Sequence, residues 1–243
     1  MRRRFFVEEF EKNTAVLHGE DAVHLGRVLR AEPGQVYELS DGERVWLAEI
    51  RSLVNSPRNG GTIEFTLLEP IEQAAPSLNI ELLISVIKFD RFEWCLEKAT
   101  ELGVTSIVPL AAARSEKKLI TAAPKRSERW EKILHESAQQ SRQLKPPALS
   151  PATPSGQAFA NSRAGCQFLF SERQDARPVR SVQMGCLSKS ISVAIGPEGG
   201  WTDEEFAAAR KAGFFETSLG EGILRTETAV ISAISILRYA LGE

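Results

Sequence analysis

Two glycine-rich stretches near the C-terminus hold most of the residues that could do chemistry. The first, Ser192 to Glu205, contains Gly-Pro-Glu-Gly-Gly at positions 196–200, and the second, Ser218 to Ala229, contains Gly-Glu-Gly at positions 220–222. In each stretch a short apolar run of strand type leads through a glycine turn into a helix. Glycine allows a positive φ and a close approach of the backbone to a ligand, and the start of a helix offers free N–H groups. Both stretches therefore suit a ligand bound by main-chain groups.

Few polar side chains accompany these two loops. They are Glu198, Arg225, Thr226 and Glu227. A pocket lined by backbone, with so few charged groups, favours a ligand that carries an adenine ring. Tight turns and helix caps would explain the same glycines without any ligand, and the residues alone leave both interpretations open.

Other common nucleotide, hydrolase and metal motifs are missing from the sequence. Arg225 stands where a dinucleotide fingerprint needs its third glycine, and the loop at 196–200 lacks the Lys-Ser/Thr of a P-loop. Neither H-E-x-x-H nor G-x-S-x-G occurs, and the three histidines, His18, His24 and His135, are too few and too scattered for a histidine-based triad or a metal centre. We therefore expect no metal.

The elements that must position these loops alternate between strand and helix from residue 78 onward. Such alternation predicts a mostly parallel sheet covered by helices. In sheets of this kind ligands bind at the carboxyl ends of the strands, so the two glycine loops would meet if their strands are neighbours. The expected strands are 78–86, 104–110, 167–170, 191–195 and 214–219, the expected helices are 89–102, 127–142, 203–212 and 226–241, and 145–155 is expected to be a loop.

The first seventy residues show a different pattern. Short β-rich runs at 4–7, 14–17, 35–39, 45–50 and 62–68 are separated by turn signals, which predicts a small barrel interrupted by one helix at 21–30. That helix would turn Val23, Val28 and Leu29 inward. A composition break at Gln73 to Ser77 marks a linker, so we expect two domains, 1–72 and 76–243.

Composition narrows the class of protein further. The chain is 42% hydrophobic and 26% charged with a net charge of −2, which is ordinary for a globular protein. The sequence contains no run of 18 apolar residues, so we predict no membrane span. The basic N-terminus is followed by too short an apolar run for a signal peptide. Cys95, Cys166 and Cys186 are odd in number and far apart, so we interpret them as buried thiols. These features predict a cytoplasmic protein.

Two local surfaces carry more positive charge than the whole chain does. Residues 114–145 hold nine Lys or Arg against four Glu, and Arg27 and Arg30 are neighbours at i,i+3 on the helix expected at 21–30. Both surfaces could bind RNA phosphates. The alternative is a set of solvated charges and helix ion pairs, because the first seventy residues hold nine Lys or Arg against twelve Asp or Glu.

The last helix, 229–241, is apolar on almost every side, with Ser232, Ser235 and Arg238 as its only polar stripe. A helix of this kind must be buried in a core or in a subunit interface. We therefore expect a homodimer.

The two C-terminal stretches together closely resemble the ribosomal small-subunit RNA uridine-N3 methyltransferase family, of the SPOUT class. Further matches in the same order are Arg4 in Arg-Phe-Phe, residues 24–30, 98–104, 114–116 and 129–133, so that the resemblance covers essentially the whole chain. One departure follows Gln140-Ser141, where the family usually has a glycine-arginine type pair and this chain has Arg142-Gln143.

The resemblance implies an α/β protein in which an N-terminal PUA-like β-barrel precedes a SPOUT-type α/β domain with a C-terminal trefoil knot. It implies S-adenosylmethionine as the cofactor, a homodimer, and 16S ribosomal RNA or an assembled small ribosomal subunit as the partner. The implied cofactor-binding residues are Phe170, Ser171, Glu172, Ile195, Gly196, Gly200, Leu219, Gly220, Ile223, Leu224 and Thr226. The implied substrate-binding residues are Arg27, Arg30, Arg114, Arg129 and Arg142.

Methylation at N3 of uridine requires that N3 lose its proton, which places negative charge on the uracil oxygens. A guanidinium suits that charge; Arg225 is the first candidate and Arg4 the second. Glu198 could accept the proton or hold its loop, and we favour the holding role. Two other classes remain: a module that binds RNA or ribosomes without catalysis, and an enzyme that uses a different nucleotide cofactor.

Overall fold

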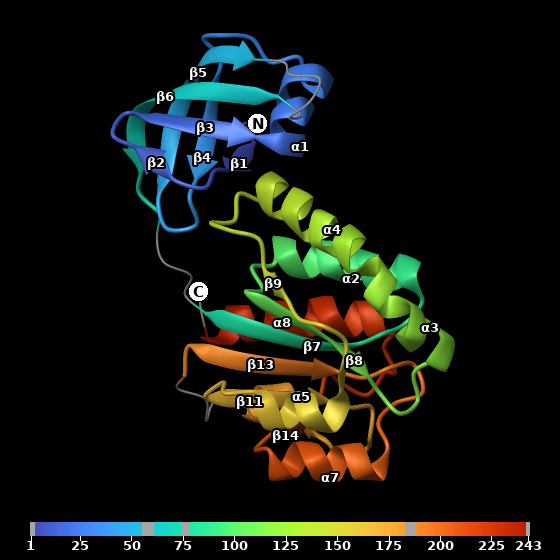
Figure 1. The fold of residues 1–243 in the computed structure, drawn as a ribbon. Coiled ribbons are helices and arrows are strands. Elements are labelled where there is room, and N and C mark those ends of the chain that lie inside the picture. Colours follow the sequence, from blue (N-terminus) through green and yellow to red (C-terminus); the bar gives the residue numbers. More distant parts are fainter. Residues whose placement is uncertain (1–2, 55–60, 74–77, 183–187, 242–243) are drawn as a thin grey trace. The chain divides into compact units, whose positions relative to one another are not determined.

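The computed structural model describes residues 3–54, 61–73, 78–182 and 188–241 (Figure 1). Contacts between residues divide the chain into two compact units. The first unit comprises Met1–Ala75 and Ala138–Pro146, and the second comprises Pro76–Ser137 and Pro147–Glu243. A short segment from the middle of the sequence therefore folds with the N-terminal strands.

The first unit is built on a curled six-stranded sheet (Figure 1). Its strands lie in the order β1-β4-β5-β6-β3-β2, and all neighbours are antiparallel except β1 and β4, which are parallel. Phe5, Leu39, Ile50 and Phe65 are fully buried in the core of this unit. The strands are β1 (Arg4–Phe6), β2 (Phe10–Glu11), β3 (Thr14–His18), β4 (Val36–Ser40), β5 (Val45–Val54) and β6 (Thr62–Ile71).

The helix of the first unit differs from the prediction. Helix α1 (Gly19–Val23) continues directly into the π-helical turn η1 (His24–Val28). The buried residues are Ala22 and Leu25, whereas Val28 is 65% exposed. The prediction that Val28 and Leu29 face inward is wrong, because a π turn holds more residues than an α turn and rotates the following side chains away from the expected stripe.

The second unit contains, among its described residues, an eight-stranded sheet in which every pairing is parallel. The order is β10-β8-β7-β13-β11-β14-β12, and β9 pairs with β8. The predicted α/β alternation with a parallel sheet is therefore confirmed. The strands are β7 (Asn79–Ser85), β8 (Ser106–Ala111), β9 (Ala148–Leu149), β10 (Thr153–Pro154), β11 (Cys166–Phe170), β12 (Arg177–Pro178), β13 (Ser190–Ile195) and β14 (Phe215–Ser218).

Helices cover both faces of this sheet (Figure 1). One face packs against α2, α4 and α8 and the other against α5 and α7. Successive strand residues point to opposite faces, so that Leu82 and Leu83 of β7 belong to different hydrophobic clusters. The helices are α2 (Phe89–Glu101), α3 (Lys117–Ala122), the 3-10 helix η2 (Ala123–Arg126), α4 (Ser127–Gln140), α5 (Ser155–Asn161), α6 (Val179–Val182), α7 (Asp203–Lys211) and α8 (Thr226–Leu241).

The apolar patterns of the long helices are confirmed in part. The spacing of Phe89, Phe92, Leu96 and Ala99 on α2 predicts one apolar stripe. Phe92, Leu96 and Ala99 are buried, Phe89 is partly buried, and Gly103 follows the end of the helix with a φ of +75° as a left-handed cap. On α8 one stripe is buried, at Val230, Ala233, Ile234 and Leu237, while Tyr239 is 85% exposed. Within a single chain, therefore, α8 is not buried on all sides.

Other predictions fail where local sequence gave no strong pattern. The expected loop at 145–155 carries the short strands β9 and β10, and α5 was not predicted. Cys95 is free, and burial together with nearby Glu227 raises the pKa of its thiol to about 12. Cys166, however, is disulfide-bonded, so the expectation of three thiols is wrong; sequence spacing does not give the distance between cysteines in space. Cys186 lies outside the described residues.

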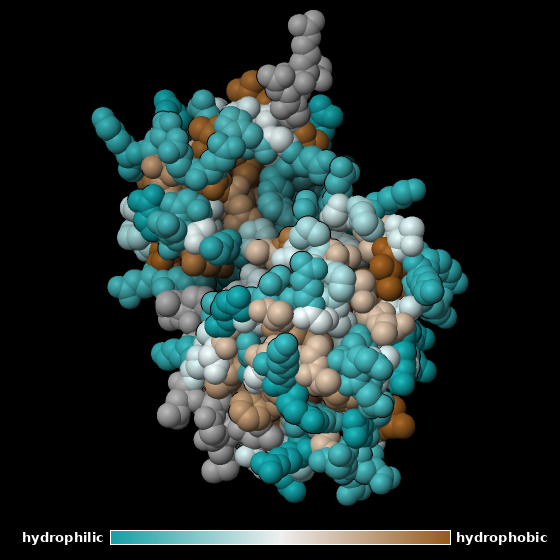
Figure 2. All heavy atoms as spheres, turned by 60° about the horizontal axis from the view of Figure 1, so that its bottom comes forward, coloured by the Kyte–Doolittle hydropathy of each residue, from teal (hydrophilic) through white to brown (hydrophobic). Residues whose placement is uncertain are grey.

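The surface shown in Figure 2 is mostly hydrophilic, and its hydrophobic residues occur in small separate groups. Within the described ranges, no helix combines the length and apolar character needed to cross a bilayer.

Candidate active site

A pocket lies at the carboxyl ends of β11, β13 and β14. The two glycine loops follow β13 and β14, but these strands are not neighbours, because β11 pairs with both of them. The segment after β11 therefore lies between the glycine loops and completes the pocket. Strand order in a parallel sheet is set by packing of the crossover helices, which the local sequence does not encode.

All the residues predicted to bind a cofactor line this one pocket, although that role itself stays a prediction. The lining residues are Phe170, Ser171, Glu172, Ile195, Gly196, Pro197, Glu198, Gly200, Trp201, Leu219, Gly220, Gly222, Ile223, Leu224, Thr226 and Ala229.

Side chains at two positions of the first glycine loop would crowd their neighbours. Gly200 has a φ of +69°, and a Cβ added there would stand 2.6 Å from Oε1 of Glu172. A Cβ added to Gly196 would stand 3.0 Å from the Trp201 ring. The N–H of Gly200 donates to the carbonyl of Pro197 at 2.8 Å, which closes a tight turn. The glycines thus keep main-chain atoms at the pocket surface.

Trp201 was missed by the sequence reasoning and joins two walls of the pocket. Its side chain is buried, and its Nε1–H donates to the carbonyl of Phe170 at 2.9 Å. The indole therefore ties the end of β11 to the loop that follows β13. The sequence feature that could have identified Trp201 is an aromatic residue directly after two glycines, because a ring can pack on backbone that carries no side chains.

Further hydrogen bonds join the remaining segments of the pocket. The Thr226 hydroxyl, buried at the start of α8, donates to the carbonyl of Gly196 at 3.2 Å and so links the two glycine loops. The Ser171 hydroxyl donates to Glu216 at 2.8 Å, and the Ser171 N–H donates to the carbonyl of Thr217 at 2.9 Å. These contacts fix the segment after β11 to β14.

The base of the first glycine loop is held by a capping box at the start of α7. The Thr202 side chain accepts the N–H of Glu205, and the Glu205 carboxylate accepts the N–H of Thr202. The same buried carboxylate accepts the N–H of Ala113 at 3.0 Å. Arg114, predicted to bind substrate, donates to the carbonyl of Gly199 at 2.8 Å. The segment after β8 therefore positions this loop.

Arg91 of α2, also missed by the sequence reasoning, contacts both glycine stretches. Its Nη1 lies 3.2 Å from Oε1 of Glu198, and its Nε lies 3.9 Å from Oε1 of Glu227. This contact supports a holding role for Glu198. Among the described residues, the second oxygen of Glu227 is buried without a hydrogen-bond partner. The sequence feature that could have identified Arg91 is its position shortly after β7, at the carboxyl edge of the sheet.

Arg225 lies between two residues that line the pocket, Leu224 and Thr226, and its side chain is exposed. Its carbonyl accepts the N–H of Ala229 in the first turn of α8. Within the described part of the chain, its guanidinium makes no hydrogen bond or ion pair. It is therefore an available cation beside the pocket.

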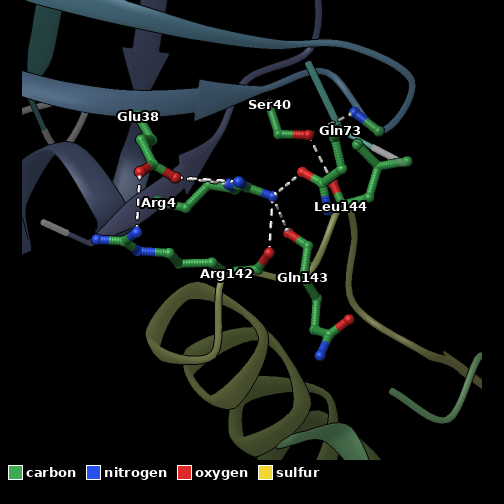
Figure 3. Close-up of polar contacts among 8 residues, drawn as sticks. Arg4, Glu38, Ser40, Gln73, Arg142, Gln143 and Leu144 are labelled. Atoms are coloured by element: carbon green, nitrogen blue, oxygen red, sulfur yellow. Dashed lines mark hydrogen bonds and ion pairs between the residues drawn. The ribbon is translucent and has the colours of Figure 1, made fainter. Parts of the chain in front are cut away.

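Arg4, the second candidate for catalysis, is a buried residue of β1 in the first unit (Figure 3). It donates to the carboxylate of Glu38, to the side chain of Gln73, and to the carbonyls of Arg142 and Gln143. Burial lowers the pKa of Arg4, and the hydrogen bond and charge of Glu38 oppose that shift. Arg4 and Arg142 are thus brought together within the first unit, and neither is among the residues that line the pocket.

The other predicted substrate residues belong to two different units. Arg27 and Arg30 are exposed at the end of η1, and Arg30 has a φ of +52°. Arg129 of α4 makes a bidentate contact with Glu93 of α2, with both N···O distances from Nε at 2.9 Å. In the described residues, no group of three or more His, Cys, Asp or Glu could hold a metal ion.

Comparison with known proteins finds relatives that are named as RNA methyltransferases. A family model described as an RNA methyltransferase domain matches residues 74–238. The chain is 36% identical over 235 residues to the ribosomal RNA small subunit methyltransferase E of Synechocystis, covering 94% of this chain and 72% of that one. It is 29% identical to the Aquifex aeolicus protein of the same name, with 96% and 97% covered.

Two solved structures are similar over nearly the whole chain. One is the ribosomal RNA small subunit methyltransferase E of Neisseria gonorrhoeae, bound to S-adenosyl methionine. Its TM-score is 0.86 and its sequence identity is 28%, and the match covers 100% of this chain and 99% of that one. A Legionella pneumophila protein in complex with the cofactor SAM has a TM-score of 0.87 and 27% identity, with the same coverage.

The Trp201 hydrogen bond can be tested by Trp201→Phe, which keeps an aromatic ring and removes the donor. We expect a loss of about 1–3 kcal/mol in the free energy of unfolding, because the buried carbonyl of Phe170 loses its partner. Urea unfolding measures this change. The control is Trp94→Phe, at a tryptophan that is 41% exposed, for which we expect less than about 0.5 kcal/mol. Equal effects of the two substitutions would contradict the proposed link.

Proposed function

The chain belongs to the RNA methyltransferase domain family, and we propose that it transfers a methyl group from S-adenosylmethionine to N3 of a uridine in small-subunit (16S) ribosomal RNA. The observation that carries this proposal is the pocket formed by the two joined glycine loops, in a chain similar throughout to a ribosomal RNA methyltransferase bound to S-adenosyl methionine. The resemblance of both loops to the uridine-N3 family supports the choice of N3.

The residues that line the pocket fit S-adenosylmethionine. The glycines at 196 and 200 leave a cradle of main-chain atoms that any Cβ would obstruct. Ile223 and Leu224 are apolar and are 84% and 40% exposed; a bound adenosyl group would cover them and remove that apolar surface from water. The cofactor supplies an activated methyl group, and the protein supplies orientation, which contributes most of the rate in an in-line displacement.

Arg225 is the residue that we assign to the chemical step. The uracil N3–H must lose its proton, and the resulting charge spreads onto the carbonyl oxygens. An arginine is too basic to take that proton, but a free guanidinium beside the pocket can stabilise the developing anion. Glu198 holds its loop through Arg91.

The residues near the pocket support methylation of a base rather than of a ribose. A ribose hydroxyl is barely acidic and would need a strong general base next to the methyl donor. The two glycine stretches contain glutamates, one aspartate and a single arginine, Arg225, but neither histidine nor lysine. The imino group of uracil is much more acidic than a hydroxyl, so these residues favour the base over the ribose.

The finer architecture is part of the same proposal. We propose that the first unit is a PUA-like barrel whose exposed Arg27 and Arg30 contact RNA, that the C-terminal part of the second unit forms a trefoil knot, and that the protein acts in the cytoplasm. The resemblance of the sequence to the SPOUT class supports these features.

A homodimer is supported by the outward side of α8. Tyr239 is 85% exposed there. A second copy would cover this apolar surface. The resemblance to the SPOUT class also supports a dimer.

The cofactor site is tested by Gly200→Val. We expect this variant to lose binding of S-adenosylmethionine, because valine cannot easily adopt a φ of +69° and its Cβ would collide with Glu172. Calorimetry measures binding, with a chelator present to establish that no metal is needed. Gly34→Val is the matched control, since Gly34 also has a positive φ (+89°) but open space around it. Undiminished binding by Gly200→Val would rule out this pocket.

The catalytic assignment is tested by Arg225→Lys. We expect the variant to bind S-adenosylmethionine normally and to lose about 100-fold in kcat, comparable to the removal of one oxyanion donor. Arg210→Lys, at an exposed arginine of α7, is the control. Nucleoside mass spectrometry with a deuterated methyl donor locates the product. Label on the ribose, or on a base other than uracil, would contradict the proposed reaction.

The dimer is tested by Ile231→Asp. Ile231 is only partly buried within the chain, so a charge there should disrupt a subunit interface more than the core. Ile234 is fully buried in the chain's own core, so a charge at that position would test folding instead. Light scattering should give about twice the chain mass of 26.8 kDa for the wild type and a lower mass for the variant. A fully active wild-type monomer would refute the dimer.

A further inference from the structure

The buried guanidinium of Arg4 holds together parts of the first unit that are distant in sequence. Arg4 is only 4% exposed. Its Nε and Nη2 donate to Oε2 of Glu38 on β4 at 3.2 and 3.0 Å, and its Nη1 donates to Oε1 of Gln73 at 2.6 Å (Figure 3). The same Nη1 donates to the carbonyls of Arg142 and Gln143 at 2.7 and 3.2 Å. With its N–H groups occupied in this way, Arg4 is poorly suited to bind a substrate directly.

The segment that Arg4 binds is strained and is held by the barrel. Arg142 has a φ of +57°, a left-handed conformation that disfavours residues with a side chain. It ends α4 in a Schellman-type cap, in which the N–H of Gln143 donates to the carbonyl of Ala138 at 2.9 Å. The hydroxyl of Ser40 donates to the carbonyl of Leu144 at 2.6 Å. Side chains of β1 and β4 therefore bind three consecutive carbonyls of this segment.

The same segment presents positive charge at the surface. Nη1 of Arg142 lies 3.4 Å from Oε1 of Glu38, and the Arg142 side chain is 39% exposed. Lys145 is exposed. The guanidinium groups of Arg4 and Arg142 both contact the carboxylate of Glu38. Strained residues that the surrounding structure fixes firmly often serve a function, and exposed cations held in place suit an RNA phosphate.

We infer that Arg4 is a positioning residue for the RNA substrate: it fixes the segment Arg142–Lys145 on the barrel so that Arg142 and Lys145 contact RNA phosphates. This inference rests on the proposed function, because it takes 16S RNA as the substrate. It gives Arg4 a role in RNA binding in place of a role at the reacting base.

Arg4→Lys and Ser40→Ala in the full chain test this role. Lys keeps a positive charge near Glu38 but cannot reproduce all the hydrogen bonds, and Ser40→Ala releases the segment at a second point without leaving a buried charge. We expect KM for RNA to rise about tenfold in Arg4→Lys and about threefold in Ser40→Ala, with kcat and the Kd for S-adenosylmethionine within about twofold of the wild type. Hydrogen exchange of the amides at 142–145 should be faster in both variants.

Arg142→Gly isolates the side chain. Glycine suits a φ of +57°, so the backbone of the segment is kept while the cation is removed. We expect weaker binding of a 16S RNA transcript, with a salt dependence of log K that falls by about one unit of slope. Arg44→Lys is the control, because Arg44 pairs with Asp41 inside its own turn; it should leave RNA binding unchanged.

A large loss of kcat in Arg4→Lys with an unchanged KM for RNA would place Arg4 at the reacting base and overturn the inference. Unchanged RNA binding in both Arg4→Lys and Arg142→Gly would also overturn it, since the segment would then carry no RNA contact. Binding is measured without turnover, so these outcomes are distinct from a failure of the proposed methyl transfer in the wild type. Melting temperatures confirm that each variant is folded.

Discussion

The hydrogen bond from the Trp201 indole to the carbonyl of Phe170 is the interaction on which the geometry of the pocket depends. It joins the end of β11 to the loop after β13, and the same ring occupies the space that a side chain at Gly196 would need. The Thr226 hydroxyl then attaches the second glycine loop to the carbonyl of Gly196. Three segments from different parts of the sequence are thus held as one surface of backbone before any ligand binds, which is the preorganisation that lets positioning accelerate a methyl transfer.

Local pattern predicted the pieces of the site better than their arrangement. The strand, turn and helix around each glycine loop follow from apolar runs and glycine positions, and most long helices begin and end within a few residues of their predicted bounds. The position of β11 between β13 and β14 could not be predicted, because neighbours in a parallel sheet are chosen by the packing of distant helices. Two further features could not be predicted because they depend on tertiary contacts. They are the π turn after α1 and the inclusion of residues 138–146 in the first unit.

The charged residues show a second limit of sequence reasoning. Arginines were predicted as substrate or catalytic groups from type and spacing, but a sequence does not show which guanidinium groups the fold itself uses. Arg114 binds the carbonyl of Gly199, and Arg129 binds Glu93. Arg225 is left as an exposed cation without a partner in the described residues. Occupancy by internal acceptors, rather than residue type, therefore distinguishes Arg114 and Arg129, which the fold itself uses, from Arg225, whose guanidinium stays available beside the pocket.

The same criterion applies to the turn after Gln140-Ser141. The position with a φ of +57° would suit glycine, and an arginine there costs about 1 kcal/mol or more in backbone strain. The strain is sustained because Arg4 and Ser40 bind the carbonyls that the turn exposes, which removes the penalty of leaving them unpaired in a partly buried place. The arginine at this position places a cation beside Glu38. The buried Arg4, held by Glu38 and Gln73, thus binds the backbone of the turn and allows a surface arginine to occupy a conformation that it would not adopt alone.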